Sequence, residues 1–104
     1  MIIVTTDFIS GHELETIGLV KGSCVQTVHV GKDIFNILKN LVGGELTSYT
    51  KMMEESREIA TERMIAEAQK LRANAIICVR YTSSNVAPNA AETTVFGTAV
   101  SFKK

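Results

Sequence analysis

Residues that break a chain or cross-link it are scarce in this sequence. Proline occurs once, at Pro88, and cysteine twice, at Cys24 and Cys78. Hydrophobic residues make up 45% of the 104 positions and charged residues 21%, a balance typical of a globular chain and not of a disordered one. The length suits one hydrophobic core, so we expect a single domain over residues 1–104.

A charge excess of either sign is also missing. Lysine plus arginine and aspartate plus glutamate number 11 each, which leaves a formal net charge of zero. Such a chain has no long-range field to draw it to phosphate backbones or anionic lipids, so we expect neither nucleic acid nor membrane as a partner. Weak self-repulsion makes association between copies easier.

Long apolar runs are absent too. The opening run at residues 2–5 has no basic segment before it and is too short for a signal peptide or a membrane span. We therefore expect a cytoplasmic protein whose two cysteines stay reduced.

The first thirty residues favour strands. Residues 2–5 are β-branched and apolar, which predicts a strand inside the sheet. Residues 14–30 are rich in Val, Ile and Thr, with Lys21-Gly22 midway, which predicts two strands joined by a tight turn. In the second of these strands, alternation places Cys24 and Gln26 on one face and Val25, Thr27 and His29 on the other.

Two helices are predicted in the middle of the chain. The first is short, begins at Asp33, repeats apolar residues at helical spacing to Val42 and ends at Gly43-Gly44. The second begins at Thr47 or Ser48 and continues to about Arg72 without Gly or Pro, over roughly 39 Å. Its Glu54, Glu55 and Glu58 match the positive end of the helix dipole.

This long helix exceeds the roughly 26 Å diameter of a domain of this size. Its apolar residues also cover more than one narrow stripe, which is typical of a helix contacted on two sides. A neighbouring copy of the chain is the simplest second partner.

The last third predicts two more strands. Residues 74–82 carry four consecutive apolar residues, Ile76 to Val79, as a central strand does, and residues 83–91 indicate a loop. Residues 93–102 alternate a bulky face with a thin one that contains Gly97 and Ala99. The fold class is α+β, with a small mixed or antiparallel sheet in the order β-β-β-α-α-β-β.

Several segments together resemble the YbjQ-like family of small bacterial and archaeal proteins. They are Val42-Gly43-Gly44-Glu45, then Tyr49, Arg57, Ala60, Met64 and Ala68, and finally Ala73-Asn74-Ala75-Ile76. Thr5-Thr6, Gly18, Gly22 and Gly97-Thr98-Ala99-Val100 also fit. The sequence departs from the family at Arg72, where a Gly usually ends the long helix in a left-handed conformation.

The resemblance implies a ring-like homo-oligomer, a pentamer, with strand and helix contacts between subunits. It also brings the label of heavy-metal binding, which similar proteins carry without an agreed biochemical function.

The metal candidates are Cys24, Cys78, His12 and His29. Soft metals need converging thiolates or imidazoles, usually from spacings such as CxxC or HxxxH, and these four residues are scattered. Either cysteine can instead be a small buried hydrophobe. A ring could still bring equivalent residues together around its axis.

The ligand candidates are the polar residues of the resemblance, Glu45, Tyr49, Arg57 and Asn74. Each also has a structural interpretation: Arg57 can pair with Glu54 or cross a subunit boundary, and Asn74 can cap a turn. Gly43-Gly44 before a helix could cradle a phosphate, but Glu45 beside it would repel one.

Sequence signals for catalysis are absent: there is no GxSxG, no P-loop and no nucleophile with a neighbouring base. We therefore assign no catalytic residue. The sequence favours an oligomeric binding module with a metal or small ligand at subunit interfaces. The alternative is a structural or protein-interaction scaffold without a ligand.

Overall fold

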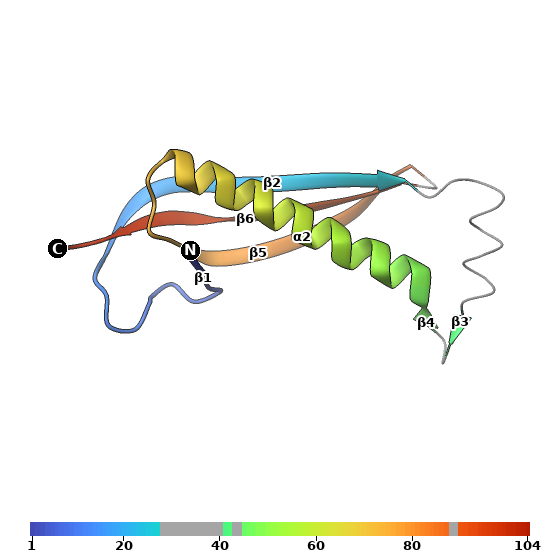
Figure 1. Cartoon of the computed structure of the whole chain (residues 1–104), viewed down its shortest axis with the longest axis horizontal. Helices are drawn as coiled ribbons and strands as arrows, with labels where there is room; N and C mark the ends of the chain where they lie inside the picture. The colour runs from blue at the N-terminus through green and yellow to red at the C-terminus, as the bar shows by residue number, and fades with distance from the viewer. Residues whose placement is uncertain (28–40, 43–44, 88–89) are drawn as a thin grey trace.

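The structure is a computed structural model that describes residues 1–27, 41–42, 45–87 and 90–104 (Figure 1). A four-stranded mixed sheet carries one long helix, α2 (Thr47–Lys70), on one face. The strands lie in the order β1 (Ile2–Ile3), β5 (Ala75–Ala87), β6 (Ala90–Phe102) and β2 (Leu14–Thr27). The α+β class and the mixed sheet are therefore confirmed.

The predicted order of elements is not reproduced. Most of the expected short helix, residues 33–40, lies outside the described residues, and α2 is the one helix within them. The last two residues of that prediction form a strand, β3 (Leu41–Val42), which pairs antiparallel with β4 (Glu45–Leu46). The expectation that residues 2–5 lie inside the sheet is also wrong, because β1 occupies one edge, parallel to β5.

Residues 14–27 of the hairpin predicted for 14–30 form a single strand, β2, and residues 28–30 lie outside the described part of the chain. Lys21 and Gly22, expected in a turn, pair in unbroken register with Phe96 and Val95 of β6. The glycine is needed for a different reason, since α2 passes directly over it. A Cβ at Gly22 would collide with the carbonyl oxygen of Ala60 and stand 2.5 Å from the backbone nitrogen of Met64.

Strands β5 and β6 also run through the segment predicted to be a loop. Ser83 pairs with Thr93 and Asn85 with Ala91, so the described part of residues 83–91 belongs to a long antiparallel pair. Ser and Asn favour turns, but here they lie on an exposed part of β5, where water satisfies polar side chains in a strand as well as in a loop.

The core lies between α2 and the sheet. Ala60, Met64 and Ala68 recur every fourth residue on the helix and are fully buried against Val20 and Cys24 of β2 and Val95 and Ala99 of β6. The thin face predicted for the last strand is thus the face that the helix covers. Small residues on both sides bring the helix backbone close to the sheet.

The helix ends in a Schellman motif. The Ala73 N–H donates to the Ala68 carbonyl at 3.1 Å, and the Arg72 N–H donates to the Gln69 carbonyl at 3.0 Å. Arg72 adopts a positive φ of 58°, the left-handed conformation that a Gly would adopt more easily. The substitution of Arg for the family's Gly therefore leaves the cap in place.

The molecule is long and thin. Its principal extents are 56 × 26 × 16 Å and its radius of gyration is 17.1 Å, against about 13 Å for a compact domain of this length. No helix among the described residues is long and apolar enough to cross a bilayer.

We predict that Gly22→Ala destabilises the protein by about 3 kcal/mol, because the added methyl group must push backbone atoms of α2 away from β2. Urea unfolding at one fixed protein concentration measures this loss. Gly18→Ala is the matched control in the same strand. Nothing lies within 4 Å of its added Cβ, so we expect a gain of about 0.5 kcal/mol. Equal effects at the two positions would contradict the close helix approach.

We predict that Arg72→Gly raises the free energy of unfolding by about 0.5–1 kcal/mol. Removing the Cβ relieves the left-handed strain, and the added freedom of the unfolded chain offsets part of the gain. Arg72→Ala retains the Cβ and should leave stability within about 0.5 kcal/mol of the wild type. A loss of stability in the glycine variant would show that the Arg72 side chain matters more than its backbone.

Candidate functional site

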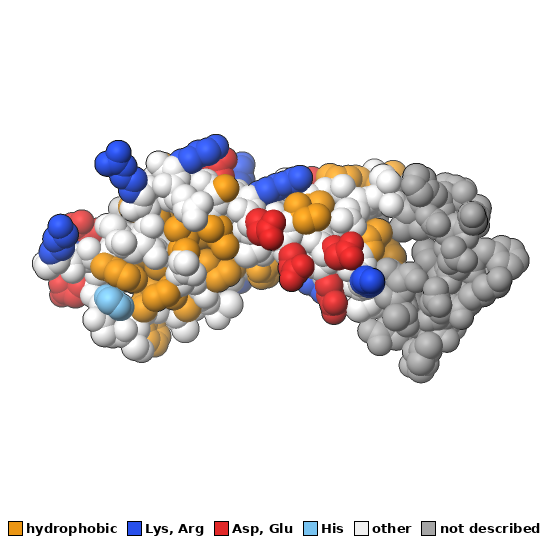
Figure 2. Space-filling model, viewed as in Figure 1, with side chains coloured by type: hydrophobic (Ala, Val, Ile, Leu, Met, Phe, Trp, Pro, Cys, Tyr) orange, Lys and Arg blue, Asp and Glu red, His pale blue; other side chains and the backbone are white. Residues whose placement is uncertain are grey.

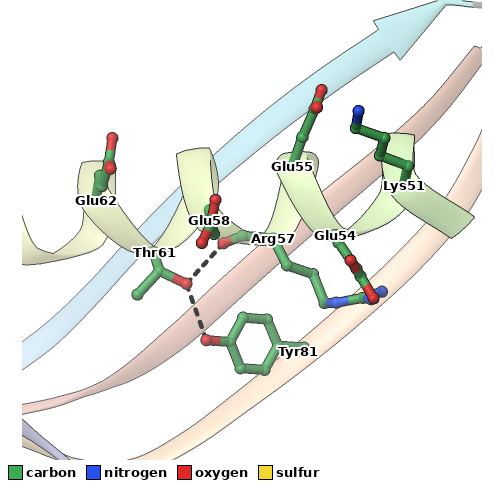
Figure 3. Close-up of a pocket in the computed structure, with 8 residues that line it drawn as sticks. All are labelled: Lys51, Glu54, Glu55, Arg57, Glu58, Thr61, Glu62 and Tyr81. Atoms are coloured by element: carbon green, nitrogen blue, oxygen red, sulfur yellow. Dashed lines mark hydrogen bonds between the residues drawn. The ribbon is translucent and has the colours of Figure 1, made fainter.

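An acidic groove lies between the N-terminal half of α2 and β5 (Figure 3). It has a volume of about 800 Å³ and is lined by four carboxylates, those of Glu54, Glu55, Glu58 and Glu62. Two cations, Lys51 and Arg57, and two neutral residues, Thr61 and Tyr81, complete its wall. The acidic groove is therefore a negatively charged surface on a chain with no net charge.

These carboxylates lie too far from the N-terminus of α2 to interact favourably with the helix dipole. The first turn of α2 contains no acidic residue, and the dipole is felt only within that turn. The dipole interpretation of Glu54, Glu55 and Glu58 is therefore wrong. Glu54, Glu58 and Glu62 follow one another at intervals of four and form one stripe along the helix.

A pair of hydroxyl groups connects the two walls of the acidic groove. The Thr61 hydroxyl donates to the Arg57 carbonyl at 2.6 Å and lies 2.8 Å from the Tyr81 hydroxyl. Threonine has a single hydroxyl proton, which the Arg57 carbonyl receives, so Tyr81 must be the donor to Thr61. This contact ties β5 to α2 in the middle of the groove, as Figure 3 shows.

A basic groove lies on the opposite flank of α2, beside β2. It has a volume of about 500 Å³, and its charged residues are Lys21, Arg63, Lys70 and Glu67. Nη1 of Arg63 donates to the Ser23 carbonyl at 2.6 Å, which holds this guanidinium against the strand. The two flanks of one helix thus carry opposite charge.

The four ligand candidates do not meet at one site in the described part of the chain. Arg57 lines the acidic groove and is half-buried, and Tyr49 lies two helical turns before it, roughly 12 Å along the axis. Glu45 belongs to β4, and its side chain is outside the described part of the structure.

Asn74 lies at the other end of the sheet. Its Oδ1 accepts the Phe102 N–H at 2.7 Å, and its own N–H donates to the Val100 carbonyl at 2.9 Å. It is seven residues before Tyr81, roughly 23 Å along the strand. Asn74 thus fastens the start of β5 to the end of β6, a structural contact that differs from the turn cap predicted from the sequence.

The two cysteines lie on different strands. Cys24 is buried on the helix side of β2 and pairs with Thr93, whereas Cys78 is half-buried where the β5 register shifts beside Gly97. The two cysteines are two strand spacings apart across the sheet and four residues apart along the strands. Their backbones are therefore separated by roughly 16 Å. Because a metal binds each thiolate at about 2.3 Å, the two cannot share an ion within one chain.

The histidines bring no further ligand to either cysteine. His12 is exposed and stacks on Phe102 with ring centroids 3.9 Å apart, and His29 lies outside the described residues. The described ranges contain no group of three or more His, Cys, Asp or Glu side chains placed to hold a metal. The described residues of one chain therefore do not fit a heavy-metal centre.

Sequence reasoning missed Tyr81 and Thr61 as members of a groove. The stripe of Glu54, Glu58 and Glu62 is visible in the sequence as a four-residue repeat. Tyr81 could not be found that way, because it reaches the helix only through the register of β5 against β6.

We predict that Tyr81→Phe lowers the free energy of unfolding by about 0.5–1 kcal/mol, since it removes one hydrogen bond at a partly exposed position. Thr61→Val should remove the same contact. In a double-mutant cycle measured by urea unfolding, Tyr81→Phe should cost nothing further in the Thr61→Val background. Additive losses would show that the two hydroxyl groups act independently.

Comparison with known proteins places the chain in a family. A family model described as "Putative heavy-metal-binding", YbjQ_1, matches residues 1–103. A UPF0145 protein of Alkaliphilus metalliredigens is 60% identical over 102 residues, which cover 98% of this chain and 99% of the relative. A UPF0145 protein of Clostridium novyi is 59% identical over 100 residues, or 96% and 97% of the two chains.

A solved structure supports the fold. The crystal structure of a protein of unknown function from Pediococcus pentosaceus, assigned to the DUF74 family, has a TM-score of 0.74 and covers 99% of this chain and 98% of its own. The two sequences are 15% identical, so this likeness concerns the fold alone. On the full-length family match and the close relatives, the chain belongs to the YbjQ family of UPF0145 proteins.

Proposed function

We propose that this protein is a homo-oligomeric binding module that holds a small ligand or a metal ion between its subunits. The family resemblance gives a ring of five as the expected assembly. The observation that carries the proposal is a pair of strand edges that lack a partner in the described part of the chain.

The first such edge belongs to β2. This strand has 14 residues and pairs on one side with β6, and no described strand lies on its other side. The second edge belongs to β5. Val4 pairs with Ile76 and Val79 at 3.0 Å each, but Arg80 to Ala87 have β6 as their one described strand partner. Rows of free N–H and C=O groups are templates for pairing with another chain.

The sheet face away from α2 also supports association. Leu19 is 69% exposed and Val25 is 53% exposed, and both lie on the side of β2 opposite the buried Val20 and Cys24. A second copy packed on this face would remove both side chains from water, which would favour association.

The position of the acidic groove supports ligand binding between subunits. The acidic groove adjoins the unpaired part of β5, so a copy paired there would close it over Arg57 and Tyr81. The family description supports a metal as one ligand class. Because one chain does not bring thiolates together, a heavy metal would need ligands from more than one copy.

We predict that native mass spectrometry of freshly purified, untagged protein shows a pentamer that carries extra mass. Metal analysis of the same sample, and titration with Zn²⁺, Cu⁺ and small anions, would then identify the class of ligand. Metal content and metal affinity should be compared first between the wild type and Cys78→Ser, with a variant of the buried cysteine, Cys24→Ser, as the control. A monomer would contradict the proposal.

A scaffold without a ligand is the second candidate, and the exposed apolar residues favour it. Its distinguishing result is a bare pentamer with no affinity for the titrated species. Recovery of a specific protein by the assembled ring, lost on Leu19→Lys, would support it.

A further inference from the structure

We propose that the basic groove beside β2 is a binding site for a small anion that carries phosphate groups. The inference rests on the binding part of the proposed function and names a class of ligand for it. It does not depend on the assembly, because every residue that carries the argument belongs to one chain.

The charge of the basic groove is the first argument. Lys21 comes from β2, and Arg63 and Lys70 come from α2, so two elements bring three cations to one groove of about 500 Å³. Glu67 is the one carboxylate among the described residues of its wall. Figure 2 shows several Lys and Arg side chains along the rim on the β2 side, and the acidic side chains gathered over α2. A hollow lined mainly by one sign of charge concentrates ions of the opposite sign.

The anchoring of Arg63 is the second argument. Its Nη1 donates to the Ser23 carbonyl at 2.6 Å, which fastens the guanidinium to the edge of β2. Gly22 leaves room for this side chain to cross the strand, since a Cβ there would stand 3.0 Å from the Cβ of Arg63. A guanidinium that is already oriented loses less conformational entropy when it binds a ligand.

The anchored guanidinium also retains the donors that suit a phosphate. The bond to Ser23 uses Nη1, so it does not engage Nε and Nη2. These two nitrogens form a planar fork that can bind two oxygens of a phosphate at once. The partner of Nη1 is a neutral carbonyl and not a carboxylate, so this contact does not cancel the positive charge of Arg63.

The other residues of the basic groove favour a phosphate-bearing ligand with more than one anionic group. Ser23 and Thr94 pair across β2 and β6 and both line the groove, and hydroxyl groups can donate to phosphate oxygens. Arg63 and Lys70 are seven residues apart, so they lie on one flank of α2, roughly 10 Å apart along the axis. Their long side chains can therefore contact different phosphate groups of one ligand.

We predict that the wild type binds pyrophosphate saturably and that Arg63→Gln weakens this binding by about tenfold, because the substitution removes a charged fork. Arg63→Lys retains the charge without the fork and should weaken binding by about threefold. Lys70→Gln should weaken the binding of pyrophosphate more than that of inorganic phosphate. Phosphorus NMR titration measures these affinities, with circular dichroism as the folding check.

The source of the phosphate group is tested with the same titration. Inorganic phosphate and glycerol phosphate are compared in the wild type and in Arg63→Gln. Tighter binding of glycerol phosphate would support a phosphorylated organic molecule as the ligand, and tighter binding of inorganic phosphate would support the free ion. Both results require the loss of affinity in Arg63→Gln.

Arg80→Gln is the matched control. Arg80 also donates through Nη1 to backbone carbonyls, those of Thr5 and Val79, but it lies outside the basic groove. This variant should bind pyrophosphate as the wild type does. A wild type that binds none of the three probes, or equal affinities in Arg63→Gln and the wild type, would overturn the anion site. A monomeric wild type that binds pyrophosphate through Arg63 would overturn the proposed assembly and leave the anion site standing.

Discussion

Backbone contact between α2 and β2 is the constraint on which the rest of this structure depends. At Gly22 the helix comes so close that no side chain fits between the two elements. Ala60 and Ala68 on the helix and Ala99 on the sheet keep the spacing small along the whole contact. Small residues gain little hydrophobic energy individually, but they allow the larger Met64 and Val95 to be fully buried. The position of the helix on the sheet is thereby determined.

That position accounts for the two grooves. The helix lies over β2 and β6, so its flanks overhang β5 on one side and the β2 edge on the other. The charges on each flank then acquire a neighbouring strand edge. A helix shifted by one strand would cover β5 and leave no acidic groove. The packing of α2 on β2 and β6 therefore determines where the two charged grooves lie.

The sequence predicted the long helix well because its signal is local: strong helix formers without Gly or Pro, and a four-residue apolar repeat. It failed at Gly22 because a glycine in a turn and a glycine under a helix look alike until the tertiary contact is known. It failed at residues 83–91 because Ser and Asn are turn residues by propensity, while pairing with β6 depends on a distant segment. Tyr81 was missed for the same reason. The four-residue spacing of Glu54, Glu58 and Glu62 can be seen in the sequence, but the sequence does not show that these residues line a groove.

The pairing of β2 with β6 has a consequence for synthesis on the ribosome. Leu14 pairs with Phe102 and Ile2 with Ala75, so both N-terminal strands take partners from the last third of the chain. Strand β2 has no partner in this sheet until residues 90–102 have emerged. Leu19 and Val25 are exposed even in the finished fold. In the nascent chain Val20 is exposed to water as well until its partners have been made. Contacts between such distant segments form slowly, so β2 stays unpaired while the intervening segments are made.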